Sequence, residues 1–242
     1  MVNAKEEREY RELRRLGQKL HVPIPEAFWG FEVFDKDGKL IQKHKQRSHS
    51  WVRNAYNLLF CQLAGVNAAD NTFGAGKLSI KLPDGTVKHG AYALYLGYNS
   101  TKSIEVADQF GRGYRGAAGE DSCGIQVGSG SVTAESFEDY VLETLISNGT
   151  GLGELSYTLQ EPHSISYESA SKILKNTQIR YFNNNSGGAV SVNEVALIGQ
   201  GSAGGSYFVK WLQTRDKLAS TVTVPDTGQL KVTYTVELSY PS

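Results

Sequence analysis

The sequence predicts a mainly β protein, a two-layer antiparallel β-sandwich of jelly-roll-like type with an N-terminal helical and extended arm and one packed helix. Composition is the first indication, because 26 Gly and 13 Tyr stand beside many Val and Thr and a single Met, a mixture typical of strands and tight turns. The second is the alternation of apolar and polar residues in segments after residue 75, the pattern of half-buried strands. The third is a change in the phase of that alternation at residues 192–195, which favours two packed layers over one flat sheet.

Residues 4–20 are predicted to form a helix. One stripe of this helix carries Tyr10, Leu13, Leu16 and Leu20. A single helix of this length is marginal in water and needs a surface to pack on, either its own domain or a neighbouring subunit. Pro23 and Pro25 break the helix and predict an extended connector, which slightly favours the neighbouring subunit. We therefore divide the chain into an arm, residues 1–27, and a β-sandwich body, residues 28–242.

A β-hairpin is expected next, in "FWGFEVFDKDGKLIQKHKQR", with its turn at residues 35–38. Its return strand places Lys43, Lys45 and Arg47 on one side. No stacking aromatic residue alternates with these charges, so we favour a solvated or protein-facing strand edge and expect no nucleic-acid partner. The basic residues and the helical stripe together form the predicted partner-binding set: Tyr10, Leu13, Leu16, Leu20, Lys43, Lys45 and Arg47.

The packed helix is predicted over residues 50–64, within "SWVRNAYNLLFCQLAG". Ser50 supplies an N-cap and Gly65 ends the helix. The stripe expected to face the core is Trp51, Ala55, Leu58, Leu59 and Leu63.

Strands and turns follow. We expect hairpin turns at residues 83–85 and 225–228 and a short strand in "GIQVGSGS". The last strand places Val232, Tyr234, Val236, Leu238 and Tyr240 on one side. The segment "SFEDYVLETLI", residues 136–146, fits either a helical turn or a bent strand.

The change of phase lies in the strand after residue 189. Val190 and Val192 share one face, whereas Val195 and Leu197 fall on the other. A β-bulge near residues 193–194, or a strand that crosses between sheets, would return both pairs to a core.

Bulk properties exclude several classes of protein. No run of about 18 apolar residues exists, so we expect no membrane span. The N-terminal segment is charged from Lys5 and has no apolar region, so we expect no secretory signal peptide. Cys61 and Cys123 lack metal-ligand spacing and are too few for a disulfide scaffold, which fits a reducing cytosol and leaves their pairing open. Residues 1–53 carry 12 Lys/Arg against 8 Asp/Glu, which fits a polar partner surface and a solvated arm equally well.

No catalytic, metal-binding or cofactor-binding residue is predicted. His44 and His49 lie five residues apart with no Cys or His pair to complete a zinc site, and His89 and His163 are each isolated. Glu138, Asp139 and Glu143 have no spacing that pairs two carboxylates for acid–base catalysis. We therefore predict that the protein is not an enzyme.

Four segments in this order resemble a recurrent set in virion structural proteins of tailed bacteriophages: "SHSWVRNAYNLLFCQLAG", "GIQVGSGSVTAESFEDYVLETLI", "IRYFNNNSGGAVSVNEVALIG" and "LASTVTVPDTGQLKVTYTVELSY". The resemblance covers roughly residues 28–240. It implies a non-enzymatic particle component present in many copies, made in the host cytoplasm and located in the virion. Its partners would be the major capsid protein or tail proteins and further copies of itself.

Within that class, a head decoration (cement) subunit ranks slightly ahead of a tail, baseplate or fibre subunit, because residues 1–49 fit an arm that reaches neighbouring subunits. A carbohydrate-binding surface module is the competing class. It would use the tyrosines Tyr92, Tyr95, Tyr98 and Tyr114 to stack on sugars, although core and rim positions in a strand are the more frequent role of such residues.

Overall fold

The computed structural model describes residues 4–64, 80–88, 113–203 and 206–240. Two helices lie in these ranges, α1 (Ala4–Leu20) and α2 (Arg53–Ala64). The first strands are β1 (Ile24–Phe34), β2 (Leu40–Ser48), β3 (Ile80–Lys81), β4 (Val87–Lys88), β5 (Gly124–Gly128) and β6 (Ser156–Tyr157). The remaining strands are β7 (Ser164–Glu168), β8 (Ile173–Asn183), β9 (Val190–Ala203), β10 (Ser206–Val224) and β11 (Gln229–Ser239).

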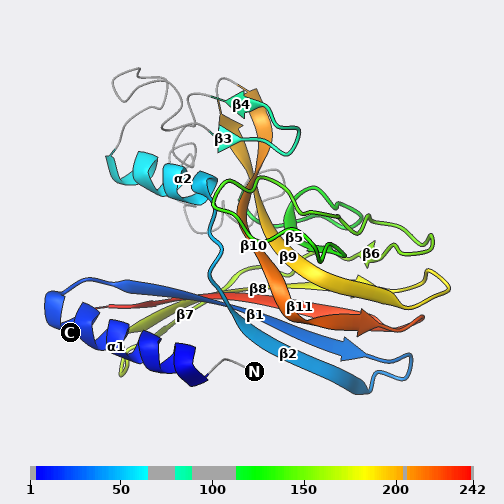
Figure 1. Ribbon diagram of the computed structural model, residues 1–242, viewed down its shortest axis with the longest axis horizontal. Coiled ribbons are helices and arrows are strands. Elements are labelled where there is room, and N and C mark those ends of the chain that lie inside the picture. The colour runs from blue at the N-terminus through cyan, green and yellow to red at the C-terminus, as the bar shows by residue number, and fades with distance from the viewer. Residues whose placement is uncertain (1–3, 65–79, 89–112, 204–205, 241–242) are drawn as a thin grey trace.

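The strands form two packed antiparallel sheets and a small hairpin. The larger sheet has the order β2-β1-β11-β8-β6, with β7 also paired to β8, and the second has the order β10-β9-β5. Strands β3 and β4 pair separately. Figure 1 shows the lower part of the β9–β10 hairpin facing the six-stranded sheet. The predicted β-sandwich is confirmed.

The main core lies between the two sheets. Alternate residues of β1 and β11 point into it, including Trp29 and Tyr234, whose ring centroids are 4.2 Å apart. Across the core, all four residues of the out-of-phase pairs are buried: Val190, Val192, Val195 and Leu197. The prediction that an irregularity returns both pairs to one core is therefore confirmed.

The pairing of β9 with β10 is irregular at this change of phase. Lys217 is opposite Glu194 and Val222 is opposite Val192, so β10 bulges between these two pairs. Backbone groups of the bulge cannot all pair with β9 and require other partners. Two side chains of β2 supply them.

Gln46 and Gln42 clamp the backbone of the bulge. The amide of Gln46 donates to the Lys217 carbonyl at 2.8 Å and accepts from the Ala219 N–H at 3.0 Å. Gln42 repeats the arrangement with the Thr221 carbonyl and the Thr223 N–H, both at 3.0 Å. The edge of the six-stranded sheet is thus joined to β10 by side chains.

A second cluster covers the far part of the β9–β10 hairpin, where Figure 1 places α2, β3 and β4. Its buried residues are Leu58, Ile80, Leu82, Val209 and Trp211. Asn54 of α2 joins the β3–β4 hairpin to the helix, because its side chain bonds both the N–H and the carbonyl of Lys81 at 2.9 Å.

The start of α2 differs from the prediction. The helix begins at Arg53, because Trp51 forms a β-bridge with Thr214 and its indole donates to the Tyr234 hydroxyl at 3.2 Å. Leu59, expected in the core, is 46% exposed, whereas Ala55 and Leu58 are buried. The side chain of Leu63 lies outside the described residues.

Three turn predictions are confirmed by backbone geometry. Gly38 and Gly85 adopt positive φ in the turns after β1 and β3. In the turn before β11, the Gly228 N–H bonds the Pro225 carbonyl. Residues 136–146, for which both alternatives were open, form turns and a single bridge from Leu145 to Gly128.

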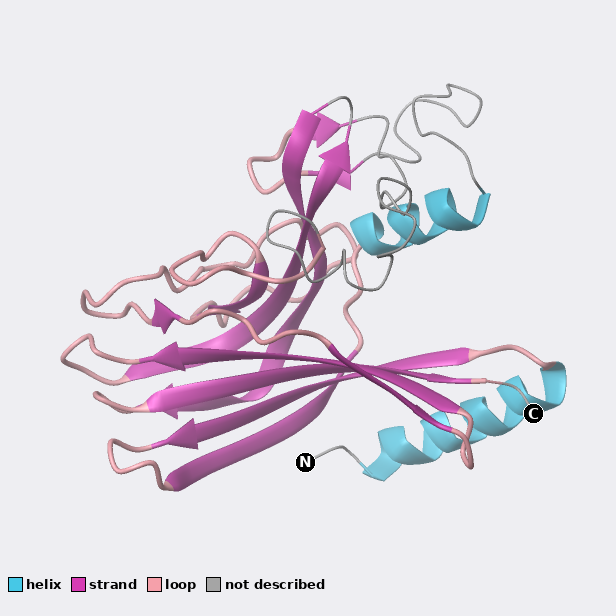
Figure 2. Cartoon of the chain, turned by 180° about the vertical axis from the view of Figure 1, so that it is seen from behind, coloured by secondary structure: helices cyan, strands magenta, loops and turns pink. Residues whose placement is uncertain are grey.

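The predicted arm is folded back on the body. Helix α1 spans the predicted residues, but strand β1 starts at Ile24 and pairs at once with Ser239 of β11. The segment predicted as an extended connector is extended but belongs to β1, and the proposed boundary at residue 27 lies inside that strand. Figure 2 shows α1 along the face of the six-stranded sheet that is turned away from β9 and β10. Neither described helix has the length and apolar content needed to cross a membrane.

Candidate interaction surface and surface pocket

Ion pairs hold α1 against the six-stranded sheet. Arg47 of β2 and Glu26 of β1 lie beneath the helix with side chains 2% and 6% exposed, and Arg47 donates to Glu26. Arg47 also donates to Glu7 of α1. From the helix, Arg14 donates to Glu26 at 2.6 Å and to Glu7 at 2.8 Å. Two acids and two arginines thus form one charge-assisted network.

Two aromatic rings complete the contact. The guanidinium carbon of Arg47 lies 4.0 Å from the centroid of the Tyr10 ring and 4.7 Å from that of Phe28, which is cation–π geometry. Burial raises the pKa of the Tyr10 hydroxyl. Tyr10, predicted to bind a partner, is therefore engaged with its own chain.

A tight reversal after α1 returns the chain to the sheet. The Val22 N–H bonds the Gly17 carbonyl at 2.9 Å, and His21 adopts a positive φ of 57°. A Cβ atom at Gly17 would lie 2.6 Å from the Ile24 side chain and 2.8 Å from the Val22 carbonyl oxygen. A larger residue would clash here, so the close approach of α1 to β1 depends on glycine at position 17.

The leucines of α1 remain in solvent. Leu13, Leu16 and Leu20 are 43%, 48% and 59% exposed. An amphipathic helix on its own domain normally buries its apolar stripe, whereas α1 presents Glu7, Tyr10 and Arg14 to the body. We call Leu13, Leu16 and Leu20 the leucine stripe.

The basic residues of β2 divide between two roles. Lys43 pairs with Glu32 at 2.9 Å, and the Lys45 ammonium lies 4.8 Å from the centroid of the Phe28 ring, both on the same outer face. Arg47 lies under α1 and cannot reach a partner while the helix is docked. Arg47, predicted to bind a partner, is therefore engaged with α1 and β1 of its own chain.

Buried carboxylates of the second sheet serve structural roles. Asp216 accepts bonds from the Trp29 indole at 2.8 Å, the Ser48 hydroxyl at 2.7 Å and the Thr214 hydroxyl at 2.9 Å. Glu194 accepts from Arg215 at 2.8 Å and from the Thr144 N–H at 2.8 Å. These bonds satisfy the acceptors, and the two hydroxyls that Asp216 holds, on Ser48 and Thr214, are buried with it.

The carboxylates considered for catalysis are also occupied. Glu138 pairs with Arg53, Asp139 with Arg215 at 2.8 Å, and Glu143 accepts from the Thr133 N–H at 2.8 Å. Within the described ranges, no group of three or more His, Cys, Asp or Glu side chains is placed to hold a metal ion.

The Cys123 thiol and the Tyr114 ring are similarly enclosed by the fold. Burial raises the pKa of the Cys123 thiol to about 11, so it is protonated at neutral pH and a poor nucleophile. Tyr114 packs edge-on against Trp211 and donates to Gln213 at 3.0 Å, with its pKa raised by burial to about 12. It is therefore not placed to stack on a sugar. Tyr92, Tyr95, Tyr98 and His89 lie outside the described residues, and of Cys61 only the backbone, in α2, is described.

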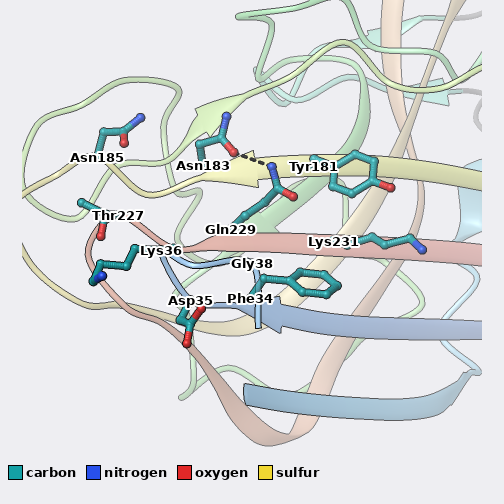
Figure 3. Close-up of a pocket in the computed structure, with 11 residues that line it drawn as sticks. Phe34, Asp35, Lys36, Gly38, Tyr181, Asn183, Asn185, Thr227, Gln229 and Lys231 are labelled. Carbon is teal, nitrogen blue, oxygen red and sulfur yellow. Dashed lines mark hydrogen bonds between the residues drawn. The ribbon is translucent and has the colours of Figure 1, made fainter. Parts of the chain in front are cut away.

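An open pocket of about 530 Å³ lies at the turn end of the six-stranded sheet. Two cross-strand rows form its floor: Phe34–Gln229–Asn183 and, one step inward, Lys231–Tyr181. Figure 3 shows these side chains on neighbouring strands, with the turn residues Asp35, Lys36, Thr227 and Asn185 around them.

Sequence reasoning missed this pocket. Its residues come from three strands that are far apart in the chain, so only the register of β1, β11 and β8 brings them together. Of the pocket's surroundings, the sequence predicted only the two turns beside it, at residues 35–38 and 225–228.

Comparisons of the chain with protein-family models, curated proteins and solved structures gave no match.

Proposed function

We propose that this protein is a non-enzymatic structural subunit of a tailed-phage virion, located on the outside of the head and bound to neighbouring virion proteins through the leucine stripe of α1. The observation that carries the proposal is the orientation of α1. Its charged side is fixed to the sheet, and its three leucines face solvent. The sequence resemblance to virion proteins supports a place in a virus particle. The enclosure of the polar side chains supports a role other than catalysis.

An exposed apolar stripe on a fixed helix is suited to helix-in-groove binding, in which leucines at helical spacing fill pockets of the partner. Arg47 and Glu26 set the position of the helix before the partner arrives. Such preorganisation lowers the entropic cost of association. Copies of one subunit on a particle lattice would each present the stripe in the same orientation.

Co-sedimentation with separated heads and tails tests the proposal. The variant Leu13→Ala/Leu16→Ala/Leu20→Ala keeps helix-favouring residues at exposed positions and should leave the fold unchanged. Removing three half-exposed leucines from an interface should cost about 3 kcal/mol, roughly a hundredfold in affinity. We expect the parent to sediment with heads and the triple variant to stay in solution.

The control is Leu152→Ala/Leu159→Ala, at two exposed leucines in loops remote from α1. It should sediment like the parent. Sedimentation with tails alone would move the protein to the tail, baseplate or fibre class. Undiminished binding of the triple variant would exclude the leucine stripe as the interface.

A further inference from the structure

We propose that the pocket at the turn end of the six-stranded sheet binds a neutral saccharide. The inference stands independently of the virion proposal, because it concerns the opposite end of the outer sheet face from the α1 contact. It rests on the pocket's side-chain chemistry, its charge balance and the backbone of one turn.

The pocket combines aromatic and amide side chains in fixed positions. Phe34 and Tyr181, both partly buried, supply ring surface from β1 and β8. Between these strands, the Gln229 amide donates to Asn183 Oδ1 at 2.8 Å (Figure 3). That bond directs the remaining capacity of the two amides, the Asn183 NH₂ group and the Gln229 oxygen, to a ligand.

A donor and an acceptor side by side complement neighbouring sugar hydroxyls, because each hydroxyl both donates and accepts. Aromatic rings with an apolar body complement the C–H face of a pyranose ring. The volume of about 530 Å³ lies within the usual range for small-molecule sites and accommodates a short oligosaccharide.

The charges of the pocket are already neutralised. Lys231 pairs with Glu32 at 3.3 Å and Lys36 with Asp37 at 3.0 Å. Asp35 accepts from two N–H groups of its own turn, those of Asp37 and Lys39. Lys43 also pairs with Glu32, at 2.9 Å, so three lysines stand against three carboxylates here and the net charge of zero favours a neutral ligand.

Thr227 gives an independent indication. It lines the pocket with a positive φ of 61°, a conformation in which a β-branched residue is an outlier. Strained residues of this kind gather at ligand-binding sites, where the surrounding structure holds them in place. Glycine would fit the same turn without strain, and the Thr227 hydroxyl is held in place by donating to the Asp226 carbonyl at 2.6 Å.

A glycan array probed with the full-length protein, including neutral and sialylated glycans, provides the first test. Titration calorimetry with the strongest neutral glycan then compares variants. We expect Tyr181→Ala and Gln229→Ala to weaken binding at least tenfold. Tyr167→Ala, an exposed tyrosine on the neighbouring strand β7, is the matched control and should bind like the parent.

Failure of every neutral glycan to bind at millimolar concentration would overturn the inference, as would retention of sialylated glycans alone. Equal affinity of the Tyr181 and Gln229 variants with the parent would exclude this pocket as the site. The leucine-stripe triple variant should retain full glycan affinity, which separates failure of this inference from failure of the virion proposal.

Discussion

Replacing Arg47 by Met should release α1 from the sheet without unfolding the body. The substitution removes the guanidinium that joins Glu26, Glu7 and the Tyr10 ring. Glu26 keeps only Arg14 as an ionic partner. Breaking a buried ion pair from one side costs about 3–5 kcal/mol, and the lower value applies because Glu7 is partly exposed. A loss of about 3 kcal/mol raises the undocked population more than a hundredfold.

Hydrogen exchange of the α1 amides measures this release. A free helix of this length is marginal in water, so undocking exposes its amides, and their protection should fall about a hundredfold. Amides of β1 and β11 should keep theirs, since the main core contains no residue of α1. Arg53→Met breaks the exposed pair with Glu138 and should change protection little. Unchanged protection of α1 in the Arg47 variant would refute the ionic account of its docking.

Three further outcomes are expected. Arg180→Met should lower the free energy of unfolding by about 3–5 kcal/mol in urea titration, because Arg180 donates to five backbone carbonyls that the variant leaves unpaired; a loss below 1 kcal/mol would contradict this. Hydrogen bonds from Arg14 and Arg47 lower the pKa of Glu7, so its contribution to docking is present at neutral pH and lost as the pH falls through that lowered pKa; α1 protection that is unchanged throughout an acid titration would argue otherwise. Thr227→Gly should raise the melting temperature by relieving a positive φ and weaken glycan binding, and a lower melting temperature would show that the turn is not strained.

Local patterns predicted most elements of this fold. Helix α1, the turns at Gly38 and Gly85 and the strand β11 follow from periodicity and turn chemistry alone. The phase change between Val192 and Val195 predicted the layered core, because only an irregularity allows both residues to be buried.

These local patterns could not predict which strands pair when they lie far apart in the sequence. The proline-containing segment after α1 fits an extended connector and the start of a strand equally well, and the choice depends on β11, which lies some two hundred residues later in the chain. The sequence pattern places Trp51 in the helix, and only the structure shows that it pairs with Thr214 instead. The same limit concealed the Arg47–Glu26 pair and the pocket, each assembled from separate strands.

The distribution of polar contacts argues for a binding role at the surface. Inside the fold, Arg180, Arg215 and Asp216 each bond to groups of their own chain and fix loops or strands to the sheets. Such closed networks add specificity to a fold and leave no capacity for a ligand. At the surface, the leucine stripe exposes apolar area that water disfavours, and the Asn183–Gln229 amides retain a donor and an acceptor directed outward. The leucine stripe and the pocket lie at opposite ends of one sheet face, so the partner protein proposed for α1 would leave the proposed ligand site uncovered.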